Sequence, residues 1–366
     1  MNFGDDESSR RDDAAPEWQV LVVGDGVAGL TTAVFLSRFG LDPVVVGECA
    51  RRSGGVLLPS AVLDMLAEVG LATDVAARGT PVTAAVRAGP TTGTVDDFAG
   101  DPPYAVGRKA LRDTLARSLP DEFRQEGTAV RALDVREDVV EVTFERGVVE
   151  RFDAVVGCDG RDSTVRAAVS DRPLESEATR TWTASIETYQ HSGTVTDRWN
   201  DACRVSLLPA EPGAFIRVTA DDGAPPADVI GDLTAGEGEA AAIRSAVDGA
   251  AGVRGVRTGV SPVWSSGRAA LVGEAACPTH PVVGIEVPAA LADARSAAAV
   301  LAAGMGGVER RFARYAERRR RGPADASGER LPPTDASSMC RLYESRTRWL
   351  DSVRNGTEDG AEGESR

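Results

Sequence analysis

Lysine and histidine are almost absent from the chain. Lys109 is the only lysine and there are 2 histidines, whereas 56 acidic residues face 41 basic ones, giving a net charge of −15 and a pI near 4.8. Nucleic acid and anionic membrane surfaces bind an excess of Lys and Arg, so this composition argues against both as partners. Acids cluster at both ends but also run through the middle, which favours a salt-adapted organism over a merely acidic tail.

Cysteine is scarce too, and long apolar runs are missing. The 5 cysteines are scattered, odd in number and form no CxxC pair, as is typical of a reduced compartment. With 2 histidines as well, we expect no metal site. No run of about 18 apolar residues occurs, and residues 1–17 are polar and acidic without the apolar stretch of a signal peptide. We therefore expect a cytoplasmic protein without a membrane span and with a disordered leader.

The first ordered segments have the pattern of a βαβ unit. An apolar run at 17–23 predicts a buried parallel strand, 27–39 has helical spacing, and 44–46 predicts a second strand. Gly40 follows the helix as a stop signal. With 366 residues, the chain has room for roughly two domains of about 150 residues each.

A glycine pattern opens the predicted helix. Gly24, Gly26 and Gly29 form GxGxxG directly after the first strand. The first glycine permits a tight turn, the second lets backbone approach a pyrophosphate at the helix start, and the third allows close packing on the strand. This fingerprint also needs an acid at the end of the second strand to bind an adenosine ribose. Glu48, which directly follows Gly47, fits this role if the turn at 40–43 is one residue longer than usual; the alternative is a solvated glutamate.

Two further segments, together with this glycine pattern, indicate a family. They are AVVGCDGRDSTVR at 154–166 and GRAALVGEAACPTHPVVG at 267–284. In this order the chain resembles the FAD-dependent aromatic hydroxylases, single-component flavoprotein monooxygenases of the para-hydroxybenzoate hydroxylase fold, over about 18–320. The resemblance implies an α/β fold: a Rossmann-like FAD-binding domain, an inserted β-sheet substrate domain and C-terminal helices.

The resemblance also assigns residues to the flavin. GRKALRDTL at 107–115 is similar to the family's R-x-x-L motif, which implies that Arg108 contacts the ribityl–phosphate region of FAD; a surface helix residue is the alternative. CDGRDSTVR at 158–166 matches the family's DG motif and implies a place near FAD for Asp159 and Gly160. The alternative there is a loop that caps a helix at Asp162 or Ser163.

The third segment departs from the family pattern, G-D-A-A-H-P followed by P-x-x-G-x-G-x-N. Pro281 and Gly284 keep it, whereas Glu274 replaces the aspartate that would hold a ribityl hydroxyl. Glu286 stands where the second glycine is expected, and Pro288 replaces the asparagine. A glutamate there adds bulk and negative charge near the flavin unless it turns outward to solvent. Pro288 is acceptable as a first helical residue.

We expect the chain to divide into discontinuous parts. From composition, we expect a leader at 1–17 and a linker, a helix and an acidic tail at 322–366. We expect the FAD-binding domain to comprise residues 18–74, 106–170 and 263–321. We expect the substrate domain to comprise residues 75–105 and 171–262.

The implied activity is that of an FAD-dependent monooxygenase. It would use NAD(P)H as a transient co-substrate, together with O₂, on a small organic substrate, with an aromatic one among the options. No second GxGxxG is present for nicotinamide, no catalytic side chain is identified, and oligomeric state stays open. Candidate substrate contacts, which core packing explains equally well, are Trp182, Trp199, Leu207 and Phe215. The alternatives are a flavin-dependent reductase on the same fold and a non-catalytic relative with weakened FAD binding.

Overall fold

A computed structural model describes most of the chain between residues 18 and 320. The described residues are 18–48, 54–89, 93–98, 100–170, 179–190, 193–200, 203–221, 230, 233, 236–248, 250, 253–254, 261, 263–278, 286–303 and 305–320. The predicted leader at 1–17, the tail at 322–366, Pro281 and Gly284 lie outside them.

A six-stranded sheet forms one half of the molecule. Its central strand is β1, and every neighbouring pair is parallel except β18–β19. All four side chains of β1 are buried, as expected for a parallel strand covered on both faces. In sheet order the strands are β18 (Ser265–Ser266), β19 (Ala269–Leu271), β12 (Ala154–Gly157), β1 (Val20–Val23), β2 (Pro43–Gly47) and β8 (Arg124–Glu126).

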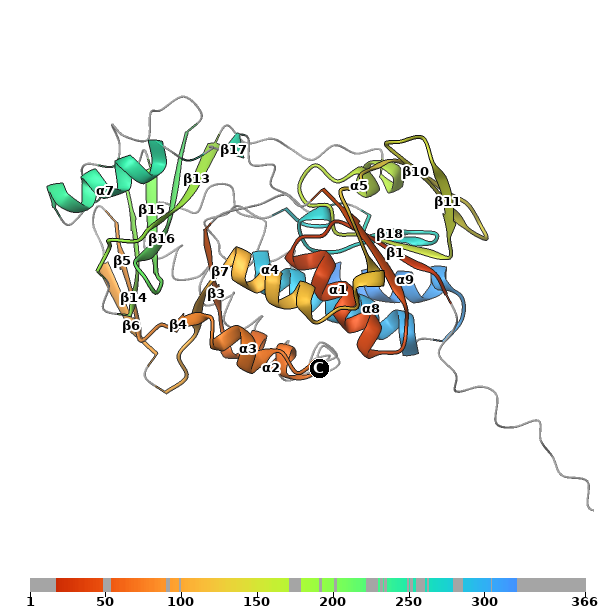
Figure 1. The fold of residues 1–366 in the computed structure, drawn as a ribbon, viewed down its shortest axis with the longest axis horizontal. Helices are drawn as coiled ribbons and strands as arrows, with labels where there is room; N and C mark the ends of the chain where they lie inside the picture. Colours follow the sequence, from red (N-terminus) through yellow and green to blue (C-terminus); the bar gives the residue numbers. More distant parts are fainter. Residues whose placement is uncertain are drawn as a thin grey trace, which may run out of the picture.

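Layers cover both faces of this sheet. Figure 1 shows α1 (Val27–Arg38), α8 (Glu286–Ala303) and α9 (Val308–Arg320) together on one side. On the other lie α5 (Thr164–Val169) and an antiparallel three-stranded sheet. The strands of that sheet are β9 (Val130–Val135), β10 (Val140–Phe144) and β11 (Val149–Phe152). β10 pairs antiparallel with both β9 and β11, so it is the middle strand of this sheet.

A seven-stranded sheet forms the other half of the molecule (Figure 1). α7 (Glu237–Asp248) packs against it, and Ile243 and Val247 of that helix join its apolar core. In sheet order the strands are β17 (Val253–Arg254), β13 (Thr179–Ile186), β16 (Ala214–Asp221), β15 (Cys203–Pro209), β14 (Thr194–Trp199), β5 (Ala84–Ala88) and β6 (Gly93–Asp97).

Shorter elements connect the two halves. A three-stranded sheet has the order β3–β7–β4, with α4 directly after β7. The bounds are β3 (Gly55–Leu58), α2 (Ser60–Ala67), α3 (Ala72–Ala76), β4 (Gly79–Pro81), β7 (Tyr104–Gly107) and α4 (Arg108–Arg117). Single 3₁₀ turns occur at Asp121–Phe123 and Gly273–Ala275. The molecule is thus α/β, with the predicted Rossmann-like sheet, inserted β-sheet and C-terminal helices; the exact domain boundaries stay a prediction.

The start of α8 differs from the sequence prediction. The helix begins at Glu286, so Pro288 is its third residue and not its first. Proline is tolerated there because the N–H groups of the first helical turn have no partner within the helix. In the described part of the chain, each helix is too short or too polar to cross a bilayer.

A buried ion pair joins the two C-terminal helices to the sheet. Asp293 of α8 and Arg319 of α9 are each 1% exposed, and Arg319 Nε donates to Asp293 Oδ1 over 2.6 Å. The other carboxylate oxygen of Asp293 accepts from the backbone N–H of Gly273 at 2.9 Å. The same helix α9 is fixed by Tyr315, whose hydroxyl donates to the carbonyl of Leu271 at 2.7 Å.

Replacing Asp293 with alanine should therefore destabilise the fold strongly. The substitution leaves the buried guanidinium of Arg319 without this carboxylate, which costs about 3–5 kcal/mol of unfolding free energy. Urea unfolding at molar salt measures the loss. The matched control, Asp293→Leu with Arg319→Leu, should lose less, because it removes both charges. A loss below about 1 kcal/mol in the single variant would contradict the assignment.

Cys158 should be chemically inert in the folded protein. Burial raises the pKa of its thiol to about 12, and the Thr32 hydroxyl lies 3.5 Å from its sulfur. At pH 8 only about 1 in 10⁴ molecules then carries the thiolate. Iodoacetamide followed by mass spectrometry should label this position in denaturant but not in the native state; equal rates would refute the prediction. Because the native thiol keeps a proton that the unfolded chain loses, its contribution to stability falls as pH rises above about 8.5.

Candidate functional site

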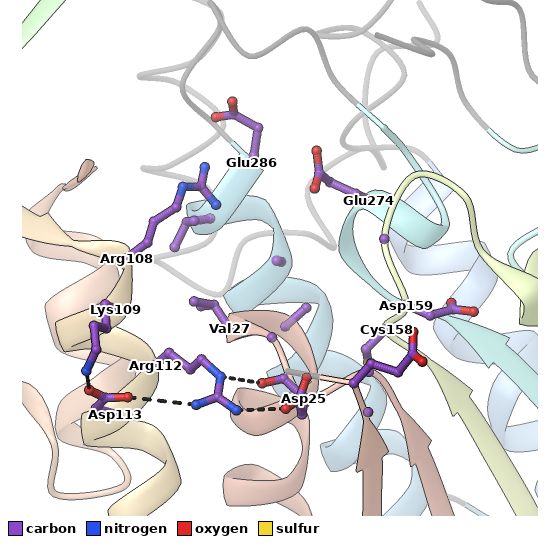
Figure 2. Close-up of a pocket in the computed structure, with 18 of the residues that line it drawn as sticks. Asp25, Val27, Arg108, Lys109, Arg112, Asp113, Cys158, Asp159, Glu274 and Glu286 are labelled. Carbon is purple, nitrogen blue, oxygen red and sulfur yellow. Dashed lines mark hydrogen bonds and ion pairs between the residues drawn. The ribbon is translucent and has the colours of Figure 1, made fainter. Parts of the chain in front are cut away.

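A cavity of ≈ 1160 Å³ opens at the carboxyl ends of β1, β2 and β12. Ligands of doubly wound sheets bind at this edge, where the connections leave the sheet in opposite directions. Parts of both halves of the molecule line it, from Val23 on β1 to Phe215 on β16. Its charged lining side chains, many of them drawn in Figure 2, are Asp25, Glu48, Arg78, Arg108, Lys109, Arg112, Asp113, Arg117, Asp159, Asp162, Glu274 and Glu286.

The glycine turn forms the floor of the cavity. Gly24 has φ +109°, a conformation that side chains rarely adopt, and its N–H donates to the carbonyl of Val46 at 2.7 Å. A Cβ on Gly29 would lie 1.7 Å from the carbonyl oxygen of Gly24. A Cβ on Gly26 would meet nothing within 4 Å. Gly24 and Gly29 thus hold the turn closed, while Gly26 leaves its open side clear for a ligand.

Glu48 lies directly after β2 at the cavity. β2 pairs with β1 residue for residue, from Val20 with Pro43 to Val23 with Val46, and ends at Gly47. Glu48 follows as an exposed residue and lines the cavity. Its contact with an adenosine ribose stays a prediction.

An ion pair that the sequence reasoning missed lies beside the glycine turn. Arg112 of α4 donates from Nη2 to Asp25 Oδ2 over 2.7 Å and from Nε to the Asp25 carbonyl over 3.0 Å (Figure 2). Both side chains are largely buried, at 18% and 12% exposed. The available signal was the position of Arg112 one helical turn after Arg108, on the same helix face.

Arg108 begins α4 at the edge of the cavity (Figure 2). Its backbone N–H donates to the carbonyl of Gly54 at 2.9 Å, which fixes the helix start against β3. The first-turn N–H groups of a helix carry partial positive charge, so this end of α4 offers both a guanidinium and a helix terminus to an anion.

The carboxylate of Asp159 is turned toward its own chain. It accepts from the Ser163 hydroxyl at 2.5 Å and from the N–H groups of Thr164 and Val165 at 2.7 and 3.1 Å. Ser163 is the N-cap of α5 and accepts from the N–H of Arg166. Burial raises the pKa of Asp159, although these hydrogen bonds oppose the shift. Asp159 and Gly160 line the cavity. The helix cap named above as the alternative is present at Ser163, and a place near FAD for Asp159 and Gly160 stays a prediction.

The motif segments at 154–166 and 267–284 contact each other directly. Arg166 Nη1 donates to the carbonyl of Ala275 at 2.9 Å. Arg161 Nε donates to Glu274 Oε1 at 2.6 Å, and the two side chains are 10% and 17% exposed. The Glu274 carboxylate, which the resemblance assigns to a ribityl hydroxyl, therefore lines the cavity while already paired with a cation.

Glu286 does not turn outward to solvent. It is the first residue of α8 and its side chain is 6% exposed. Its Oε1 lies 3.5 Å from Arg217 Nη1, on β16 of the seven-stranded sheet. The negative charge that we expected to oppose a flavin thus lies inside the cavity, with an arginine beside it and the positive end of a helix beneath it.

Of the four candidate substrate contacts, one lines the cavity and three do not. Phe215 lines the cavity and packs so closely on β3 and β7 that a Cβ on Gly55 would lie 2.3 Å from its ring. Trp182, Trp199 and Leu207 do not line this cavity. All three are buried, Trp182 and Leu207 in the core of the seven-stranded sheet. Ser185 on β13 lines the cavity and was not predicted; it lies on the opposite face of the strand from Trp182.

Metal binding finds no support in the described residues. They contain no cluster of three or more His, Cys, Asp or Glu side chains suited to a metal ion.

Sequence comparison with curated proteins finds monooxygenases. The chain is 30% identical over 164 residues to 3-amino-4-hydroxybenzoate 2-monooxygenase of Streptomyces cremeus, and 33% identical over 171 residues to FAD-dependent monooxygenase esdpE of Penicillium shearii. These matches cover 41% and 42% of this chain. They span only 42% and 35% of the relatives' own lengths.

Solved structures share the fold over nearly the whole chain. HpxO of Klebsiella pneumoniae, complexed with FAD and uric acid, has a TM-score of 0.70 at 19% identity and covers 93% of this chain and 96% of its own. 2-Methyl-3-hydroxypyridine-5-carboxylic acid oxygenase has a TM-score of 0.75 at 19% identity and covers 92% and 96%. The family model for the FAD binding domain matches residues 17–242, more than half of the chain. The chain belongs to the FAD binding domain family.

Proposed function

We propose that the protein is an FAD-dependent monooxygenase that uses NAD(P)H and O₂ to hydroxylate a small organic substrate. The observation that carries the proposal is the cavity itself. It unites the glycine turn, the start of α4, the DG segment and the start of α8 at one edge of a parallel sheet. Its volume of ≈ 1160 Å³ exceeds the 300–1,000 Å³ of typical small-ligand sites, as an extended dinucleotide with a substrate requires.

The residues present fit FAD. The open side of Gly26 and the N-terminus of α1 suit the pyrophosphate, since backbone N–H groups there bind anions without a side chain. Arg108 suits the ribityl–phosphate region. We further propose that the flavin end lies near Glu274 and near the segment that contains Pro281 and Gly284. Asp159 and Gly160 would line the cavity between the pyrophosphate and the flavin. The Asp159 carboxylate would hold this segment in place through its hydrogen bonds to the start of α5.

The protein contributes positioning and exclusion of water. When bound, FAD would supply the redox chemistry that couples oxidation of NAD(P)H by O₂ to insertion of one oxygen atom into the substrate, with the other atom leaving as water. Phe215 closes the cavity against β3 and β7, and Ser185 beside it offers a hydroxyl for a polar substrate group. The Streptomyces cremeus relative is named for 3-amino-4-hydroxybenzoate, which supports an aromatic substrate for this chain as well.

One observation favours a second candidate, a non-catalytic relative with weak FAD binding. Seven acidic side chains line the cavity against five basic ones, so an anionic cofactor meets a net negative wall. Glu286 adds to that wall at a position where the family pattern has glycine.

The decisive experiment is purification at molar salt followed by addition of FAD. The proposed enzyme should be yellow or become so, and it should oxidise NADH or NADPH with consumption of O₂ once a suitable phenol or aminophenol is present. Bound flavin that oxidises NAD(P)H without consuming O₂ would indicate the reductase instead. Protein that retains no flavin from excess FAD would refute both enzymes and leave the non-catalytic relative.

Replacing Glu286 with glycine should strengthen FAD binding. The substitution removes one negative charge from inside the cavity and leaves the positive charge of Arg217, so the affinity for an anionic cofactor should rise roughly threefold to tenfold. Quenching of flavin fluorescence measures the dissociation constant. Glu68→Gly, which removes an exposed carboxylate paired with Arg295 outside the cavity, is the control and should change little. Unchanged affinity in Glu286→Gly would show that this charge does not matter.

A further inference from the structure

The seven-stranded sheet has two chemically different faces. Alternate residues of its strands, Trp182 and Ile216 among them, form an apolar core on the side that packs against α7. Residues at the positions between these point to the opposite face. One row across that face pairs Ser206 of β15 with Arg217 of β16, and Arg217 with Thr183 of β13. The face turned away from the α7 core therefore carries polar side chains.

A buried ion pair continues this polar row. Asp197 of β14 pairs with Ser206 in the sheet, and its Oδ1 accepts from the Ser206 hydroxyl at 2.9 Å. Arg204 Nε donates to the same oxygen at 2.6 Å, and the side chains of Arg204 and Asp197 are 8% and 7% exposed. The row thus places Arg217 beside polar neighbours that are themselves held in fixed contacts.

The carboxylate of Glu286 meets Arg217 only loosely. Its Oε1 lies 3.5 Å from Arg217 Nη1, whereas Arg161 and Glu274 are 2.6 Å apart. Hydrogen bonds from N–H to oxygen have donor–acceptor distances of about 2.7–3.2 Å. Within the described part of the chain this is the one polar contact of Glu286, whose side chain is 6% exposed. Because a carboxylate accepts about four hydrogen bonds, Glu286 keeps unused acceptor sites although it is buried.

These acceptor sites lie at the end of the cavity formed by the seven-stranded sheet and α8. Glu286 lines the cavity together with Ser185 of β13 and Phe215 of β16, which are directly paired in the sheet. Figure 2 shows Glu286 at the opposite end of the drawn residues from Asp25 of the glycine turn. A small ligand at this end therefore meets an aromatic wall, a hydroxyl and a carboxylate.

We propose that Glu286 selects the substrate: its carboxylate accepts a hydrogen bond from an O–H or N–H group of the substrate ring and excludes a carboxylate from that position. This inference rests on the proposed function, because it describes the substrate of that enzyme. A donor fills the unused acceptor sites, whereas an anion would lie against a like charge. Arg217 does not line the cavity, so an incoming anion meets Glu286 first.

A purely structural role for Glu286 makes a different prediction. If the side chain only ties α8 to the seven-stranded sheet, its loss should weaken all ring compounds equally. If it binds a donor, its loss should change the order in which the protein prefers them. The two roles therefore separate when the ligand is varied together with the residue.

The experiment measures how tightly three ring compounds bind to the full chain loaded with FAD. They are 2-aminophenol, which carries O–H and N–H donors, 1,2-dimethoxybenzene, which carries none, and salicylate, which carries a carboxylate. Isothermal titration calorimetry at molar salt, without NAD(P)H, gives the dissociation constants. Wild type should bind 2-aminophenol about tenfold to a hundredfold more tightly than either of the others, the range expected for hydrogen bonds to a charged group.

Glu286→Gln tests the charge with little change of shape. The amide keeps one acceptor oxygen and adds N–H donors, so this variant should bind salicylate about tenfold more tightly than wild type and keep part of the affinity for 2-aminophenol. Glu286→Leu should lose the preference for 2-aminophenol over 1,2-dimethoxybenzene. The matched control, Glu68→Gln, alters an exposed carboxylate paired with Arg295 outside the cavity and should keep the wild-type order.

The outcomes separate this inference from the proposed function. Bound flavin is measured first, from its visible absorption. Wild type that holds flavin but prefers salicylate, treats the three compounds alike or binds none of them would overturn the inference alone. Equal weakening of all three compounds in Glu286→Leu, or unchanged salicylate binding in Glu286→Gln, would also overturn it. Wild type that retains no flavin from excess FAD would overturn both.

Discussion

Three strands of the parallel sheet meet the glycine turn at distances that leave no room for side chains. A Cβ on Gly24 would lie 2.4 Å from the carbonyl oxygen of Cys158, after β12, and one on Gly47 would lie 2.6 Å from the nitrogen of Asp25. This close backbone contact fixes the positions of the elements around the cavity. It fixes where α1 begins, where β2 must end, and which side chains can enter the cavity.

Charge is arranged around that contact in pairs drawn from distant parts of the chain. Asp25 is held by Arg112, Glu274 by Arg161 and Glu286 lies beside Arg217. Each pair places a carboxylate at the cavity wall with a guanidinium behind or beside it. The cavity thus keeps acidic side chains although it is suited to an anionic ligand. Backbone N–H groups and helix N-termini provide the attraction for that ligand.

Sequence reasoning succeeded where the controlling interactions are local. The spacing of Gly24, Gly26 and Gly29 after an apolar run was sufficient to predict the turn, because strand, turn and helix are adjacent in the chain. It failed for Asp25 and Arg112, which lie 87 residues apart and meet only through the fold. Trp182 and Leu207 show the same limit, since an apolar side chain looks alike in a core and in a ligand wall.

The contact between Glu286 and Arg217 links α8 to the seven-stranded sheet, and so to the other half of the molecule. A charge buried without its partner is costly, so neither position can change freely while the other stays as it is. Divergence at 286 is consequently coupled to divergence at 217. A lineage that acquires the glutamate first, before the arginine is in place, must pass through a less stable protein, which constrains the order in which the two substitutions can arise.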